Sequence, residues 1–207
     1  MVITYQGENY VKVTAGPFTF LMDPADERSF RGAKFVLMTQ NPLSRSGTGE
    51  TSTLVLREPL VINHPGEYQT EGVRITGYHI GTLGHSATGE PSVETELIAY
   101  RVLMEGITLG FLGHLTELPD QKAVGGLADM DLLFIPGGGQ PWLKASDAAK
   151  LVRQLAPGLV IPTLLTKKTC EGFAKELGVK FPTPAEKLVI KKKDIVPKAC
   201  TVVCLAA

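Results

Sequence analysis

The spacing of apolar residues changes half-way along the chain, and this change most restricts the folds open to it. The first half contains short runs of β-branched and aromatic residues, separated by turn-forming residues rich in glycine and proline. In the second half, segments with helical patterns at 119–127, 145–155 and 170–177 alternate with short strand-like runs. Runs of the first kind indicate strands, whereas helical spacing indicates one buried helix face. The change of pattern predicts an α/β fold in which helices pack outside two sheets.

Strands are predicted in both halves of the chain. The first three form an antiparallel meander, and two later arms form a hairpin across Glu105 and Gly106. The segment 40–49 is predicted as a polar loop, and His64-Pro65-Gly66 as a turn. The strands are expected at 2–5, 10–13, 18–21, 35–39, 61–63, 72–77, 95–104, 107–112, 131–135, 159–161, 187–190 and 200–205.

Length and charge restrict the classes of protein to which the chain can belong. Its 207 residues, 43% of them hydrophobic, suit a single domain, 1–207, with two halves of roughly 1–115 and 116–207 sharing one core. Lys and Arg number 21 and so do Asp and Glu, so no general attraction to nucleic acid or an anionic membrane is expected. No apolar run reaches the roughly 18–20 residues that span a bilayer.

The cysteines and the first residues of the chain indicate the cellular compartment in which it is expected. Cys170, Cys200 and Cys204 are an odd number without the spacing of a metal site. An extended tail would place Cys200 and Cys204 on the same face, where they would be buried free thiols. The chain also starts without a basic stretch followed by an apolar one, so no signal peptide is expected. These features predict a reduced, cytoplasmic protein.

Several short motifs occur in a characteristic order. Each alone is weak, but together they extend over nearly the whole chain. They are the opening Ile3-Thr4-Tyr5-Gln6-Gly7, then Leu21-Met22-Asp23-Pro24, Pro65-Gly66-Glu67-Tyr68, Gly110-Phe111-Leu112-Gly113, the segment 131–136 followed by Gly138-Gly139, Ala148-Ala149, and Val160-Ile161-Pro162.

This order of motifs resembles the metallo-β-lactamase superfamily, in particular its small ascorbate-phosphate-lactonase-like branch of predicted zinc-dependent hydrolases. The resemblance implies an α/β, four-layered αββα sandwich. It also implies hydrolysis by two metal ions, usually zinc, which generate a hydroxide nucleophile and polarise the scissile group. Members of this branch often form homo-oligomers, so association is compatible with the resemblance.

The chain departs from the family at its metal ligands. The family's His-x-His-x-Asp-His loop aligns with Gln40-Asn41-Pro42-Leu43-Ser44-Arg45, and Glu8 replaces a histidine of the opening turn. Glutamine is a poor zinc ligand, and Arg45 would place a fixed cation where the second metal belongs. The positions that correspond to former ligands are Gln40, Pro42, Ser44, Arg45, Thr82, His114 and Leu164. The alignment therefore predicts that the usual dinuclear site is absent, with no cofactor.

A few polar residues remain as candidates for a pocket. His114 replaces the bridging aspartate at the end of a core strand, either plugging the old metal cavity or acting as a ligand. Arg45 could pair with Asp23 or Glu67 in that cavity. The full set of candidates is Asp23, Glu67, His79, His85 and His114.

Three functional hypotheses follow. The first is a non-catalytic binding or assembly module for an unknown small molecule or protein. The alternative is a hydrolase of phosphoesters or lactones, using zinc or another divalent metal at a rearranged site around Asp23, His79, His85 and His114. The third is metal-free hydrolysis or anion binding through Ser44, Arg45 and His114.

Other features are better explained by structure. His85-Ser86 lacks an oriented acid for nucleophilic catalysis. Gly137-Gly138-Gly139 lacks the spacing of a phosphate-binding loop and suits a tight exit from a strand. Lys191-Lys192-Lys193 is expected at a solvated edge, so nucleic acid and membrane are not expected as partners.

Overall fold

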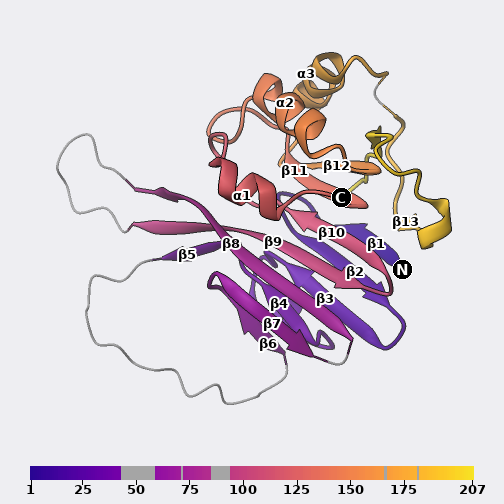
Figure 1. The fold of residues 1–207 in the computed structure, drawn as a ribbon. Helices are drawn as coiled ribbons and strands as arrows, with labels where there is room; N and C mark the ends of the chain where they lie inside the picture. The colour runs from indigo at the N-terminus through magenta and orange to yellow at the C-terminus, as the bar shows by residue number, and fades with distance from the viewer. Residues whose placement is uncertain (43–58, 71, 85–93, 166, 181) are drawn as a thin grey trace.

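Two mixed β-sheets lie face to face in the computed structural model of this chain (Figure 1). The structure describes residues 1–42, 59–70, 72–84, 94–165, 167–180 and 182–207, so Ser44, Arg45 and His85 lie outside the described residues. Six strands form the first sheet, in the order β13 (Leu188–Val189), β1 (Val2–Tyr5), β2 (Val11–Ala15), β3 (Phe18–Met22), β4 (Phe35–Leu37) and β6 (Leu60–Ile62).

The second sheet has eight strands. Its order is β14 (Thr201–Val202), β12 (Leu159–Thr163), β11 (Leu132–Pro136), β10 (Ile107–Phe111), β9 (Thr95–Met104), β8 (Val73–Leu83) and β7 (Gly66–Thr70), with β5 (Gln40–Pro42) paired to β9. The predicted meander is confirmed, because β1, β2 and β3 pair antiparallel. The predicted hairpin is confirmed too: β9 and β10 join at Glu105 and Gly106, both with positive φ (52° and 73°), as a tight two-residue hairpin turn requires.

Aromatic side chains fill the space between the sheets. The rings of Phe111 and Phe134 stack with centroids 4.5 Å apart, and Phe20 from the opposite sheet meets Phe111 edge-on at 5.8 Å. Tyr100 is fully buried beside them, and its hydroxyl donates to the carbonyls of Met38 and Ile62. Alternate residues of each strand face this core, as expected for strands with two distinct faces.

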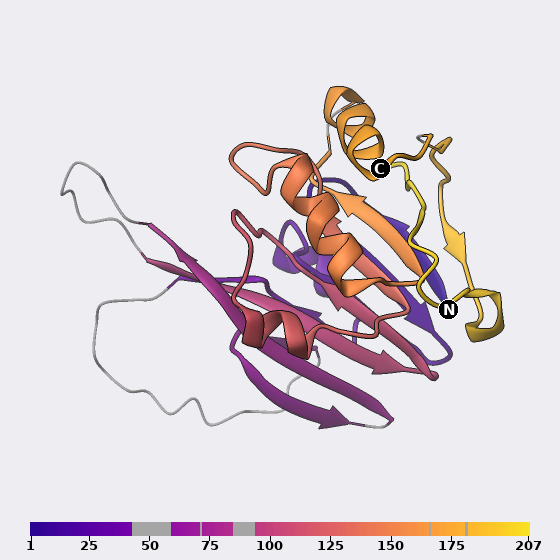
Figure 2. The same cartoon turned by 45° about the horizontal axis from the view of Figure 1, so that its top comes forward.

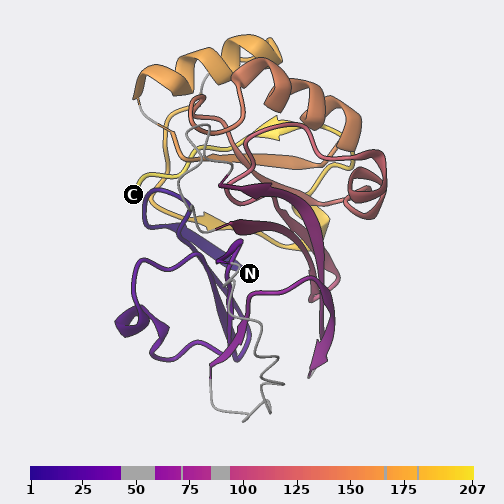
Figure 3. The same ribbon diagram turned by 90° about the vertical axis from the view of Figure 1, so that its left-hand side faces the viewer.

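Three α-helices cover the eight-stranded sheet. They are α1 (Gln121–Gly126), α2 (Ala145–Leu155) and α3 (Lys167–Leu177). Helix α2 has the predicted bounds and buries Ala148, Leu151, Val152 and Leu155. Figures 2 and 3 show α2 and α3 side by side on the face that points away from the six-stranded sheet. Within the described residues, no helix combines the length and apolarity needed to cross a membrane.

The outer face of the six-stranded sheet has a thinner cover. Leu21 and Val36 point outward there and pack with Phe30 of a short 3₁₀ helix, η1 (Glu27–Phe30). Helices, two sheets and this outer segment together form the α/β sandwich that the resemblance implied, and that prediction is confirmed.

Several elements differ from the sequence-based expectation, among them β8, which extends to Leu83 although the predicted strand ended at residue 77. Strand β5 lies where a polar loop was predicted, because residues 40–42 pair with the edge of β9. Strand β7 begins at the end of the turn predicted at 64–66 and was not predicted itself. It is an edge strand that exposes Glu67 and Gln69, and its sequence therefore has no apolar run that would indicate a strand. The C-terminal strand is only Thr201–Val202, shorter than the predicted 200–205, and Cys200 with a φ of 50° lies outside it, directly before its first residue.

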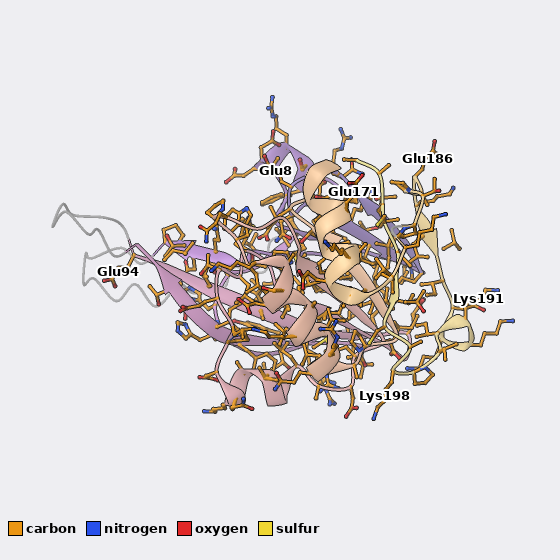
Figure 4. The ribbon with its side chains drawn as sticks, turned by 90° about the horizontal axis from the view of Figure 1, so that it is seen from above. Glu8, Glu94, Glu171, Glu186, Lys191 and Lys198 are labelled. Atoms are coloured by element: carbon orange, nitrogen blue, oxygen red, sulfur yellow. The ribbon has the colours of Figure 1, made fainter. Side chains whose placement is uncertain are left out.

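Two remaining details concern cysteines and lysines. Cys200 is half-buried and Cys204 is buried, and both pack in the cluster between the helices and the eight-stranded sheet. Lys191 lies at the periphery of the molecule beside the 3₁₀ helix η2 (Lys192–Asp194), as Figure 4 shows. Lys192 differs, since its ammonium contacts both carboxylate oxygens of Asp131 at 2.6 and 2.7 Å.

Candidate functional site

The carboxyl ends of parallel strands bring a small polar group together. Strand β3 runs parallel to β4, and β10 runs parallel to β11 and β12. Side chains just beyond the carboxyl ends of such strands meet at one edge of the fold. Asp23 follows β3, Thr39 lies two residues after β4, and His114 follows β10. These three residues are in contact at that edge.

Asp23 is the centre of this group. The amide of Thr39 donates to its Oδ1 at 2.7 Å, and the Thr39 hydroxyl donates to its Oδ2 at 2.5 Å. The side-chain amide of Asn9 also donates to Oδ2. Asp23 has a φ of 44°, a left-handed conformation that Asp tolerates better than most residues. Three donors therefore hold the carboxylate in one orientation.

His114 completes the group. Its Nδ1 lies 2.9 Å from the hydroxyl of Thr39 and 3.4 Å from Oδ2 of Asp23. Because the single Thr39 hydroxyl proton goes to Asp23, we assign the proton between Thr39 and His114 to Nδ1. In the neutral imidazole this leaves Nε2 with its lone pair free. The ring also lies against Trp142, with centroids 4.8 Å apart and planes tilted by 59°.

Glycine makes this arrangement sterically possible. Gly113, immediately before His114, has a φ of 54°, and a Cβ added there would lie 2.3 Å from Cβ of Thr39. A side chain at this position would displace the hydroxyl that bridges Asp23 and His114. Gly138 is similarly constrained, because its added Cβ would lie 1.9 Å from the carbonyl oxygen of Leu164. This close approach gives the glycine-rich loop a structural role.

Burial dominates the electrostatics of the pair. It lowers the pKa of His114 below its ordinary value, opposed by the negative charges of Asp23 and Glu8. Burial also raises the pKa of Asp23, opposed by His114 and by the hydrogen bonds from Thr39 and Asn9. Since every hydrogen-bond partner of Asp23 donates to it, the network fits the carboxylate form. A lowered His114 pKa keeps the imidazole neutral near pH 7, with Nε2 as a proton or metal acceptor.

Two buried polar atoms near this edge have no partner within the described part of the chain. They are Oδ1 of Asn9 and Oγ1 of Thr163, on side chains 2% and 1% exposed. The two segments meet, because the amide of Leu164 donates to the carbonyl of Glu8 at 2.7 Å. A buried polar atom left unpaired is costly, so ordered water or a polar ligand is expected to satisfy them.

His79 belongs to a second polar cluster. Its Nδ1 lies 3.0 Å from Oε1 of Glu96. The amide nitrogen of Asn41 lies 3.5 Å from Oε2 of the same carboxylate and 3.2 Å from Nδ1 of His64. Glu96 is thus the partner of His79, whereas Asp23 is the partner of His114. The structure divides the candidate pocket residues between separate pairs.

The remaining candidate positions are dispersed. Gln40 is half-buried and Pro42 exposed, both in β5, and Thr82 is exposed in β8. Leu164 follows β12 with a φ of 54°. Glu67 lies in a surface hollow on the outer face of the eight-stranded sheet, a different location from that of Asp23.

The side chains that the structure describes offer few ligands for a metal ion. Among the residues that the structure describes, no three His, Cys, Asp or Glu side chains gather as a metal-binding group. At the edge of the sandwich the donors are one imidazole nitrogen and a carboxylate already engaged by three donors. This set does not fit two divalent cations, which need several free carboxylate and imidazole ligands.

Comparison with known proteins identifies the family. A model described as the β-lactamase superfamily domain matches residues 2–164. The chain belongs to this superfamily. Proteins named UPF0173 metal-dependent hydrolase, from Anoxybacillus flavithermus and Lysinibacillus sphaericus, are 25% and 24% identical to it, each match covering 78% of this chain and 84% of the relative.

Solved structures agree on the fold. A Thermotoga maritima protein described as a zinc-dependent hydrolase of the metallo-β-lactamase superfamily superposes with a TM-score of 0.71 at 22% identity, covering 99% of this chain and 98% of that one. A metal-dependent hydrolase from Parabacteroides distasonis gives 0.60 at 18% identity, with 98% and 91% covered. The resemblance to the metallo-β-lactamase superfamily is therefore confirmed.

Sequence reasoning missed part of this site. Asp23 and His114 were singled out, but their bridge, Thr39, was not, nor were Asn9 and Thr163. Thr39 directly precedes the segment 40–45, which was aligned with the family's metal-ligand loop, and Asn9 follows Glu8 in the opening turn. Their positions beside two family motifs were the available signal. Trp142 has no sequence signal for a role, because only the folded chain places its ring against His114.

Proposed function

We propose that this member of the superfamily binds a small molecule at His114 and does not hold the family's two-metal centre. The observation that carries the proposal is the fixed pair of His114 and Asp23 in place of a cage of free ligands. One accessible imidazole nitrogen can accept one hydrogen bond or bind one metal weakly. It cannot alone generate a metal-bound hydroxide between two cations.

The chemistry of the ligand follows from the two rings. Neutral Nε2 of His114 accepts a hydrogen bond, so the ligand presents an N–H or O–H group. Trp142 offers an aromatic face 4.8 Å from the imidazole, against which a flat or apolar part can pack. The His114 side chain is 16% exposed, so a ligand can reach it without unfolding the edge of the sandwich.

Assays for hydrolysis test this proposal. The purified chain is incubated with generic phosphodiester, ester and lactone substrates, with and without a chelator. We expect no turnover above background in either condition. Turnover abolished by the chelator would contradict the proposal. A rate lost in His114→Ala but indifferent to the chelator would also contradict it, and would support metal-free hydrolysis instead.

The alternative is a metal-dependent hydrolase with a rearranged site. It is favoured by the names of the relatives from Anoxybacillus flavithermus and Lysinibacillus sphaericus, both metal-dependent hydrolases. In this alternative, His114 would be one ligand and would need partners besides Asp23. Added zinc should then restore chelator-sensitive turnover, and His114→Ala should remove both turnover and bound zinc. His64→Ala serves as the matched control, since His64 lies outside that candidate set and contacts Asn41 instead.

A further inference from the structure

A hollow of about 540 Å³ opens on the outer face of the eight-stranded sheet. Strands β7, β8 and β9 form its floor, away from the edge that carries His114. Its polar lining consists of Glu67, Gln69, Arg74, Thr76, Tyr78 and Arg101. A hollow of this size lies within the range of small-molecule sites.

Two arginines lie next to one another in this hollow. Arg101 pairs with Thr76 across β8 and β9, and Arg74 pairs with Leu103, so the two arginines are diagonal neighbours on one face. Within the described residues, neither guanidinium has an ion pair or a hydrogen bond to a side chain. Like charges placed together on a sheet repel, and an anion between them would remove that repulsion.

We propose that this hollow binds the phosphate group of a small organic phosphate. Two guanidinium groups match a dianion, and each presents paired N–H donors suited to phosphate oxygens. The hydroxyls of Thr76 and Tyr78 and the amide of Gln69 supply further donors at the same face.

Glu67 sharpens the inference. Glu67 lines the same hollow and pairs in register with Thr76, whose other cross-strand neighbour is Arg101. It should repel the phosphate while accepting hydrogen bonds from hydroxyls elsewhere on the ligand. Removing an arginine and removing this acid should therefore change phosphate affinity in opposite directions.

Calorimetric titration of the full chain with pyrophosphate at low ionic strength tests the proposal. We expect saturable binding that weakens about tenfold in Arg74→Gln and in Arg101→Gln, because each loses charge-assisted hydrogen bonds. Glu67→Gln should bind several-fold more tightly. Arg153→Gln is the matched control, since Arg153 is exposed on α2 and its guanidinium donates to the carbonyl of Glu176. Its affinity should be unchanged.

Several outcomes would overturn the proposal. They are no saturable binding, equal weakening in Arg153→Gln, or weaker binding in Glu67→Gln. Tighter binding of citrate than of pyrophosphate would overturn the assignment to phosphate. Circular dichroism checks that each variant folds. If Arg101→Gln does not fold, Arg74→Gln still tests the proposal, because Arg74 is exposed. None of these results depends on His114, so a failed site there leaves this test intact.

Discussion

Asp23, Thr39 and His114 act as one unit at the scale of single residues. The hydroxyl of Thr39 contacts both the carboxylate and the imidazole, so a change in any member alters the other two. A buried polar network of this kind stabilises the fold only when each of its polar groups has a hydrogen-bond partner.

Asp23→Asn should lower the free energy of unfolding by about 2–4 kcal/mol. An amide nitrogen would face the donors of Asn9 and Thr39, leaving buried donors unpaired. The measurement is chemical denaturation followed by circular dichroism. Asp129→Asn is the matched control, because Asp129 is exposed and also has a positive φ (54°), which Asn tolerates. Equal, small losses for both variants would show that the network contributes little.

Stability should depend on pH through His114. Burial lowers the His114 pKa below its ordinary 6.5, so the unfolded chain takes up the proton first. The free energy of unfolding therefore falls as pH decreases from 6.5 through the His114 pKa of the folded state. Asp23 acts in the opposite sense: its raised pKa means that its contribution is lost as pH rises from 3.8 through its folded value.

Imidazole titration by NMR checks this dependence directly. His114 should titrate below 6.5, and the decline in stability between pH 7 and the His114 pKa should be smaller in His114→Gln. A His114 pKa above 6.5 would contradict the account, because attraction to Asp23 would then outweigh burial.

Turns decide the geometry at the scale of elements. The turn after β10 must bring His114 back toward β4, and Gly113 permits this with its positive φ and absent side chain. Gly178, which follows α3 with a φ of 75°, shares the positive φ but has open space where a Cβ would lie.

Gly113→Ala should therefore destabilise the chain more than Gly178→Ala. Both pay the backbone cost of a left-handed alanine, about 1–2 kcal/mol. Gly113→Ala adds a clash with Thr39, which should also shift the His114 resonance in NMR spectra. Similar unfolding free energies for the two variants, with an unmoved His114 signal, would rule out this steric role.

Sequence patterns predicted most helices and strands because buried apolar residues recur at a fixed spacing along each kind of element. Helix α2 and the hairpin of β9 and β10 were predicted well, since apolar spacing and a Glu-Gly turn are local signals. Strands β5 and β7 were missed because pairing with β9 and β8 stabilises segments with few apolar residues. The His114 site was predicted only in part, since Thr39 and Asn9 gain their roles from contacts across the fold.

The whole molecule has the sandwich fold of the superfamily. Four of the positions that the alignment predicted as former metal ligands lie in different parts of this fold, each with its own contacts. Gln40 and Pro42 belong to a paired strand, Leu164 donates its amide to Glu8, and His114 is bound to Asp23 through Thr39. Core packing between the sheets does not depend on a metal, because apolar side chains fill it. The fold alone therefore does not determine the chemistry of this chain.

Metal content of the full chain, purified without chelators and measured by inductively coupled plasma mass spectrometry, tests the central claim most directly. The account predicts well below one equivalent of zinc, manganese or iron per chain after dialysis. About two equivalents, reduced in His114→Ala but not in His64→Ala, would match a two-metal centre and contradict the account.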